Sequence, residues 1–206
     1  GDSVAMHGAE AYDDAGKAVA WAGDVDNDGY GDLLIGAPLN DDKASSAGAA
    51  YLVGVEDLDL TTFTDYDLDD APTLMGESSS DLAGTAVAGV GDINGDGVDD
   101  FAVGAPQDDD GGSNAGAAYF IVSAPAGNMS LADAHAKVVG DTGSKFGSAF
   151  VAMGDLDGDG KSDVAIGAPE ADENGNHSGR VAVFSGKDLT GSLDWNDALF
   201  TFDGEA

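Results

Sequence analysis

The chain has 206 residues, enough for one globular domain or one array of repeats, and 40 acidic residues against 7 basic ones give it a formal net charge of −33. This charge excludes non-specific nucleic-acid binding and attraction to anionic membranes, and no apolar run reaches the about 20 residues that membrane insertion requires. The sequence contains no cysteine, so no disulfide stabilises the fold. The electrostatic field of a chain with this negative charge instead attracts cations or a basic partner.

Self-similarity along the chain predicts three units, at residues 11–76, 77–140 and 141–206. Each unit has an alternating stretch of small residues, an acidic nine-residue loop, an apolar run that ends in Gly-Ala-Pro, a polar loop, and a second apolar run. A short segment ending in glycine closes each unit. Residues 1–10 contain a fourth copy of that closing segment, SVAMHG, before the first unit.

The apolar runs are four to seven residues long, partly β-branched or aromatic, and bounded by Gly, Pro and Asp. This pattern is typical of strands, and no run has a sustained helical period. We therefore predict an all-β fold of three four-stranded antiparallel units with a surplus outer strand at the N-terminus. Such sheets must stack to bury their faces. Only a short helix is considered, at residues 61–70 or 132–135.

The acidic loops read DVDNDGYGD, DINGDGVDD and DLDGDGKSD, at residues 24–32, 92–100 and 155–163. Each has oxygen-bearing side chains at positions 1, 3, 5 and 9 and a glycine at position 6, which allows a sharp turn. Oxygen ligands in a flexible loop suit Ca²⁺, and position 7 needs to offer only its carbonyl. The predicted ligands of three calcium sites are Asp24, Asp26, Asp28, Tyr30 and Asp32; Asp92, Asn94, Asp96, Val98 and Asp100; and Asp155, Asp157, Asp159, Lys161 and Asp163.

Two other interpretations of the loops, an EF-hand and a plain hairpin turn, fit the sequence less well. An EF-hand requires a glutamate at position 12 and a flanking helix, but position 12 is Ile35, Val103 or Ile166, each in a strand-like run. Plain hairpin turns would not repeat an acid at position 9 three times. Because Asn94 removes one charge, we predict that the second site is the weakest.

The combination of a Phe-Gly-like start, DxDxDGxxD and Gly-Ala-Pro resembles the FG-GAP repeat of integrin α-subunit β-propellers and of many secreted microbial proteins. Only the third unit has Phe146-Gly147; the others have Ala15-Gly16 and Ala83-Gly84. The resemblance implies four-stranded blades around an axis, with calcium between the first two strands of each blade. Family propellers typically have seven blades, so either the chain is a segment of a longer array or several copies assemble.

The resemblance implies a calcium-binding extracellular module for adhesion or recognition, with the loops opposite the calcium as the recognition face. Its partner would be a basic or cation-bridged protein or glycan. The alternatives are a structural subunit that assembles through its open blade edges and a lectin-like module that uses Trp21 and Trp195. No histidine lies near a nucleophile in a recognised motif, so we predict that the protein is not an enzyme. Asn128 and Asn176 match the glycosylation acceptor pattern.

Overall fold

The computed structural model describes residues 4–58 and 64–205. These residues form an all-β fold with a few single-turn 3₁₀ helices, which confirms the predicted class. Within these two ranges, no helix has the length and apolar character that a membrane crossing requires. The strands are β1 (Met6–His7), β2 (Ala18–Gly23), β3 (Asp32–Ala37), β4 (Ala49–Gly54), β5 (Tyr66–Asp67), β6 (Thr73–Met75), β7 (Ala86–Gly91), β8 (Asp100–Ala105), β9 (Ala117–Ile121), β10 (Met129–Ser130), β11 (Ala136–Val139), β12 (Ala149–Gly154), β13 (Asp163–Ala168), β14 (Arg180–Phe184), β15 (Gly191–Asp194) and β16 (Phe200–Asp203).

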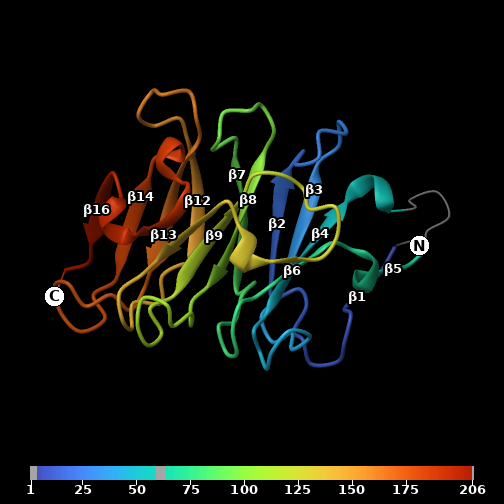
Figure 1. Cartoon of the computed structure of the whole chain (residues 1–206), viewed down its shortest axis with the longest axis horizontal. Helices are drawn as coiled ribbons and strands as arrows, with labels where there is room; N and C mark the ends of the chain where they lie inside the picture. Colours follow the sequence, from blue (N-terminus) through green and yellow to red (C-terminus); the bar gives the residue numbers. More distant parts are fainter. Residues whose placement is uncertain (1–3, 59–63, 206) are drawn as a thin grey trace.

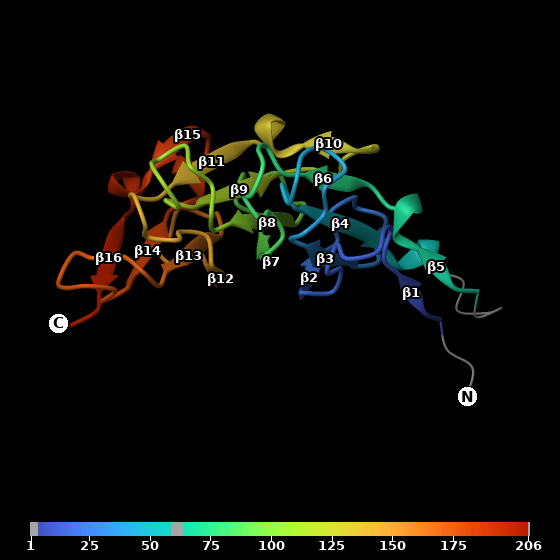
Figure 2. The same ribbon diagram turned by 90° about the horizontal axis from the view of Figure 1, so that it is seen from below.

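Three larger sheets follow one another along the chain (Figure 1). Sheet one has the strand order β10-β6-β4-β3-β2, sheet two has β15-β11-β9-β8-β7, and sheet three has β12-β13-β14-β16. In each of these sheets, four strands that are neighbours in the sheet pair in an antiparallel manner, as the repeated runs predict. Seen from below, the sheets lie side by side in an open row that does not close into a ring (Figure 2).

A short strand of two to four residues from the following unit adds to the outer strand of each preceding one, in parallel. Strand β10 pairs with β6 and β15 pairs with β11, while β5 pairs in the same way with the N-terminal strand β1. These added strands are not predicted from the sequence, because β5 and β10 have only two residues each and β15 has a single apolar residue, so none shows a period of two. They make sheets one and two five-stranded rather than four-stranded.

The core lies between the sheets. One cluster of buried residues joins sheets one and two and includes Leu34, Leu74 and Phe101. A second joins sheets two and three and includes Phe120, Ile166 and Phe184. Strand β2 packs beside β7 and β7 beside β12, so the first strands of the three sheets lie together.

Glycine allows the close approach of these first strands. A Cβ on Gly89 would lie 2.5 Å from the Trp21 carbonyl oxygen, so a larger residue would separate β2 from β7. Each first strand also has a register shift just before it ends, and the glycine there has a positive φ that turns the chain into the acidic loop.

The considered helices prove to be short 3₁₀ turns. One spans Leu68–Asp70 and the other Leu131–Asp133, and each directly follows one of the added two-residue strands. Further 3₁₀ turns span Val55–Asp57, Gly186–Asp188 and Trp195–Asp197. Residues 61–63 of the first considered helix, and Ser3 of the N-terminal closing segment, lie outside the described residues.

Candidate metal centres

The three acidic loops lie at one edge of the sheets, and the loops that follow Gly-Ala-Pro lie at the opposite edge (Figure 1). Each acidic loop connects the first strand of a sheet to the second. Positions 1 to 8 form the loop, and the aspartate at position 9 is the first residue of β3, β8 or β13. The fold therefore places the predicted ligands at equivalent positions in all three sheets.

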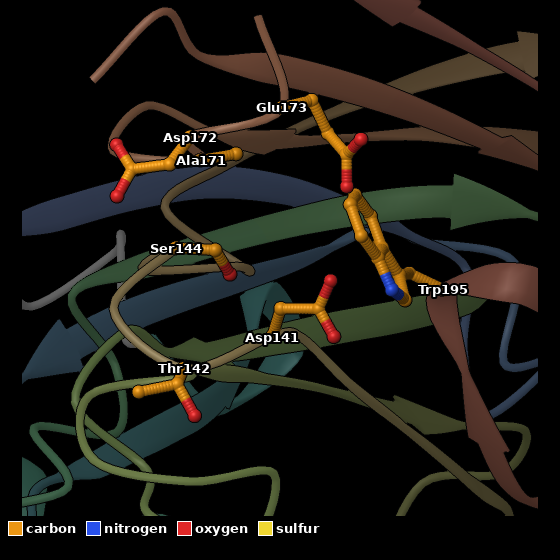
Figure 3. Close-up of a pocket in the computed structure, with 7 residues that line it drawn as sticks. All are labelled: Asp141, Thr142, Ser144, Ala171, Asp172, Glu173 and Trp195. Carbon is orange, nitrogen blue, oxygen red and sulfur yellow. The ribbon is translucent and has the colours of Figure 1, made fainter. Parts of the chain in front are cut away.

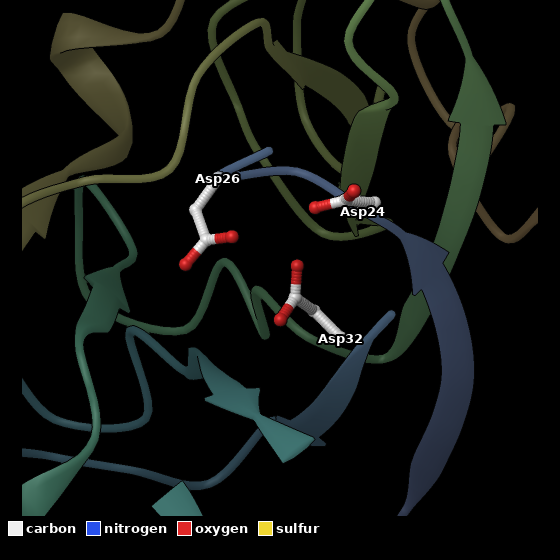
Figure 4. Close-up of side chains that lie close together, drawn as sticks. All are labelled: Asp24, Asp26 and Asp32. Carbon is white, nitrogen blue, oxygen red and sulfur yellow. The ribbon is translucent and has the colours of Figure 1, made fainter. Parts of the chain in front are cut away.

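Carboxylate oxygens converge in the first and third loops. In the first, oxygens of Asp24, Asp26 and Asp32 all lie within 4.8 Å of one another, and Figure 4 shows the three carboxylates facing a common point. In the third, the equivalent set is Asp155, Asp157 and Asp163. Within the described residues, the second loop has no such set of three acids, since Asn94 stands at position 3. Its amide oxygen remains available as a ligand.

Backbone amides hold the loop carboxylates in place. The Asp24 carboxylate accepts hydrogen bonds from the amides of Asp28 and Gly29, at 3.0 and 3.1 Å. The side chain at position 3 accepts from the amide at position 5 in all three loops. The side chain at position 5 accepts from the amide of Tyr30, Val98 or Lys161 at position 7. The loops are thus turned so that the carboxylates gather, although like charges repel.

The aspartates at position 9 are buried: Asp32 is 1% exposed, and Asp100 and Asp163 are 0% exposed. Burial raises the pKa of Asp32 to about 6 and that of Asp100 to about 7, because desolvation penalises the charged carboxylate. One oxygen of each accepts a backbone amide, from Val25, Ile93 or Leu156.

The second oxygen of Asp100 is buried and has no hydrogen-bond partner among the described residues. A buried oxygen without a donor is costly, and a bound cation would satisfy it. The residues of the second loop therefore fit a metal ion even though only three of its five predicted ligands are acidic. The ligand set in all three loops consists of oxygen atoms alone, which suits a hard cation.

Two residues beside the loops escaped the sequence analysis. Glu56 is the third residue after Val53 in β4, and one of its oxygens lies within 4.8 Å of oxygens of Asp26 and Asp28. Lys187 is the third residue after Phe184, the equivalent residue of β14, since both pair with the second residue of the preceding strand. Its Nζ lies 3.1 Å from Asp157 and 3.5 Å from Asp159.

The equivalent position in sheet two is Ala124, so the same site beside the three loops carries a negative, a neutral and a positive residue. The stretch after the second apolar run varies in length, which concealed this correspondence in the sequence. In the first and third units, a charged residue three positions beyond the run was the signal in the sequence. Because the Lys187 ammonium group lies beside two carboxylates of the third loop, we expect weak cation binding there as well. The sequence alone predicts weak binding only for the second loop.

Comparison with known proteins identifies the repeat. The family described as FG-GAP repeat matches residues 15–53, 83–121 and 146–184. Phosphatidylinositol-glycan-specific phospholipase D of Bos taurus is 36% identical over 173 residues, which cover 81% of this chain and 20% of that protein. Integrin alpha-PS2 of Drosophila melanogaster is 33% identical over 162 residues, covering 73% of this chain and 11% of the integrin. Integrin alpha-8 of Mus musculus is 30% identical over 183 residues, covering 85% and 15%.

These relatives correct one prediction. The sequence analysis predicted that the protein is not an enzyme, but a phospholipase is among its relatives, in Bos taurus, Rattus norvegicus, Mus musculus and Homo sapiens. The chain spans about a fifth of the length of these phospholipases. Repeats of this kind therefore occur in proteins that include enzymes, whatever catalytic motifs the repeats themselves contain.

Proposed function

The chain belongs to the FG-GAP repeat family, and from that membership we propose that it is a calcium-binding extracellular module for adhesion or recognition. In this proposal the four consecutive antiparallel strands of each sheet are one propeller blade, with boundaries at residues 11–76, 77–140 and 141–206. Residues 1–10 supply the outer strand of a preceding blade. Three Ca²⁺ ions are held by the acidic loops and have a structural role.

The buried aspartate at position 9 is the observation that supports calcium most directly. Asp100 has a buried oxygen with no partner among the described residues, beside the loop carboxylates of Asp92 and Asp96. In the absence of a cation this arrangement combines desolvation with repulsion between like charges. A cation relieves both, so each loop gains order when it binds. At a concentration about 100-fold above its dissociation constant, each ion would stabilise the fold by about 2.7 kcal/mol.

The loops also contact one another, which links cation binding to the packing of the sheets. The Asp99 carboxylate accepts a hydrogen bond from the Asp24 amide at 3.1 Å. The Ser162 amide donates to the Asp92 carbonyl at 2.8 Å. An ion that orders one loop therefore stabilises the junction with the next sheet.

Calorimetric titration tests this function. Protein freed of divalent ions with a chelator is titrated with CaCl₂, and three bound ions are expected. The variant Asp100→Asn should bind two, because it loses the carboxylate at the centre of the second site. The variant Asp133→Asn changes an exposed aspartate outside the loops and should still bind three. Absence of calcium binding to the unmodified protein would refute the proposal.

Recognition is proposed for the edge opposite the calcium loops. The loops there carry Asn40, Asp41, Asp42, Lys43, Asp108, Asp109, Asp110, Asp172, Glu173, Asn174 and His177. Their acidity favours a basic or cation-bridged protein or glycan partner. Binding screens with peptide and glycan arrays, in calcium and in chelator, test this part of the proposal.

A second candidate function, assembly with other copies or further blades, is favoured by the outer face of sheet three. Leu74 and Val138 are buried between sheets, at 0% exposure, whereas Phe202 at the equivalent position of β16 is 62% exposed. Val181 is 39% exposed where Ala50 and Ala118 are buried. An exposed apolar sheet face of this kind favours pairing. Measurement of particle size with and without chelator distinguishes a monomer from calcium-dependent polymers.

A further inference from the structure

The edge proposed for recognition already contains one bound ammonium group, supplied by the chain itself. At the junction of sheets one and two, Lys137 Nζ lies 3.1 Å from Glu77, 3.0 Å from Asp108 and 2.6 Å from Asp110. Its Nζ also lies 5.0 Å from the centre of the Tyr119 ring. Three carboxylates and an aromatic ring thus surround one ammonium group.

Two of these three carboxylate positions recur at the junction of sheets two and three. Asp141 follows Gly140 as Glu77 follows Gly76, and Glu173 stands four residues after the Gly-Ala-Pro proline, as Asp110 does. The lysine does not recur. Lys137 is paired with Tyr119 in the β11–β9 ladder, and the equivalent pair in the β16–β14 ladder is Thr201 with Ala182. Asp108 is replaced by Ala171.

A cavity lies at the second junction, and Ala171 forms part of its wall. Its volume is about 300 Å³, and its walls include Asp141, Ser144, Ala171, Glu173 and Trp195. Figure 3 shows the carboxyl groups of Asp141 and Glu173 both pointing toward the Trp195 indole. The cavity has the size and the mixture of aromatic and polar walls of a site for a small ligand or a single side chain.

The wall of the cavity is held by contacts within the chain. The Trp195 side chain hydrogen-bonds to Asp141 and is only 6% exposed. The Arg180 guanidinium stacks 3.4 Å from the centre of the indole ring and pairs with Glu173 at 3.2 Å. Asp141, however, has no ion pair of its own among the described contacts, and burial raises its pKa. The carboxylates around the cavity outnumber the one arginine.

We propose that this cavity binds a primary ammonium group, the side chain of a lysine on a protein partner. The proposal rests on the recognition role proposed above, because it names the partner chemistry of that edge. Lys137 supplies the precedent, since the equivalent carboxylates of the neighbouring junction bind an ammonium group in this same chain. At the outer side of sheet one the residue equivalent to Asp108 is Asn40, and its amide group donates hydrogen bonds to Asp13 and Asp42.

Other cations fit the cavity less well. Asp141, Asp172 and Glu173 are not among the described groups whose carboxylate oxygens converge within 4.8 Å, whereas acids of the first and third acidic loops are. A guanidinium already covers one face of Trp195, so a second one could not stack there. A slender ammonium on an alkyl chain can pass the indole and reach Asp141, and contact between cation and ring adds to the attraction.

The experiment uses the two tryptophans of the full chain, in saturating calcium. The probe is Nα-acetyl-lysine N-methylamide, and the uncharged control is the norleucine analogue. We expect the lysine probe, at millimolar concentrations, to shift the indole N–H resonance of Trp195. The resonance of Trp21, which is 64% exposed on β2, should stay in place. The norleucine analogue should shift neither.

Variants locate the site. Thr201→Lys places a lysine at the strand position that Lys137 has in sheet two. We expect this variant to weaken probe binding about tenfold or more, because its own ammonium group would compete with the probe for the carboxylates. Thr201→Met, of similar length but uncharged, should retain at least part of the binding, and Asp141→Asn should weaken it. An amide spectrum confirms that each variant is folded.

The outcomes separate this inference from the calcium proposal. If the lysine probe leaves Trp195 unchanged while calcium still binds the three loops, the ammonium site is refuted and the calcium module stands. If calcium itself shifts Trp195 and the lysine probe does not, the cavity is a metal site and the inference is overturned. Equal shifts with lysine and norleucine would show an apolar pocket and would also overturn it.

Discussion

Lys187 Nζ lies 3.1 Å from the carboxylate of Asp157, so an ammonium group stands beside the third acidic loop. The equivalent place beside the first loop holds Glu56, within 4.8 Å of Asp26 and Asp28. The loops themselves are nearly alike in their carboxylates. The flanking residues should therefore make the sites differ in cation affinity. The first site gains a negative charge from Glu56, whereas a cation at the third site must displace the positive charge of Lys187.

Removal of the lysine should strengthen the third site. We expect Lys187→Met to raise calcium affinity there by about two- to fivefold, the range typical of exposed charge pairs. The reason is that Asp157 and Asp159 no longer have a competing cation. Calorimetry on a background with the other two sites disabled measures the change. Lys17→Met, which removes an exposed lysine paired with Asp14, is the control and should have no effect on the third site.

Neutralisation of Glu56 should act in the opposite direction at the first site. Glu56→Gln keeps the size of the side chain but removes its charge, and we expect calcium affinity at the first loop to fall about two- to tenfold. The same calorimetric titration reports it. Glu10→Gln, at an exposed glutamate away from the loops, should leave the affinity unchanged. A stronger first site in Glu56→Gln would rule out this grading.

Asp81 gives the fold a pH dependence that does not involve the metal sites. It is 4% exposed, and burial raises its pKa to about 6, above the ordinary value of 3.8. The folded state therefore binds more protons than the unfolded state between about pH 4 and pH 6. The contribution of Asp81 to the free energy of unfolding is thus present at low pH and is lost as pH rises through that window.

The variant Asp81→Asn tests this titration. Asparagine can still accept the Ser78 amide bond at 2.8 Å but cannot ionise. Relative to the unmodified protein, the variant should become more stable by about 1–3 kcal/mol as pH rises from 4 to 7. Urea unfolding at fixed calcium across that pH range measures the difference. A constant difference at all pH values would contradict the raised pKa.

Phe202 on the outer face of sheet three should drive self-association. Its ring is 62% exposed and lies 5.4 Å from that of Phe200, on the strand β16. We expect Phe202→Ser to reduce association at high protein concentration, because it removes the largest exposed apolar group of that face. Sedimentation velocity over a range of concentrations measures this. Tyr12→Ser, at an aromatic residue that is 93% exposed outside the sheets, is the control.

Much of this fold is predictable from the sequence because its information is local and repeated. The alternating runs predict the four consecutive strands of each sheet, and the turn glycines and aspartates predict the loops between them. The aspartate that recurs at position 9 predicts a ligand at that point of each loop. The structure places Asp32, Asp100 and Asp163 in buried positions at the start of the second strands.

The remainder depends on contacts between distant residues. The short added strands β5, β10 and β15 are defined only by the strands that they pair with. Glu56 and Lys187 come close to the loops only after the third strand has paired. The cavity beside Trp195 is formed by residues from distant parts of the chain, among them Asp141, Ala171 and Glu173. No local pattern contains these relationships.

Thermal unfolding in excess calcium and in excess chelator tests the calcium proposal most directly. Three ions, each about 100-fold above its dissociation constant, would together stabilise the fold by about 8 kcal/mol. For a chain of this length we expect the melting temperature to be roughly 15–30 °C higher in calcium than in chelator. Equal melting temperatures in the two conditions would contradict the account.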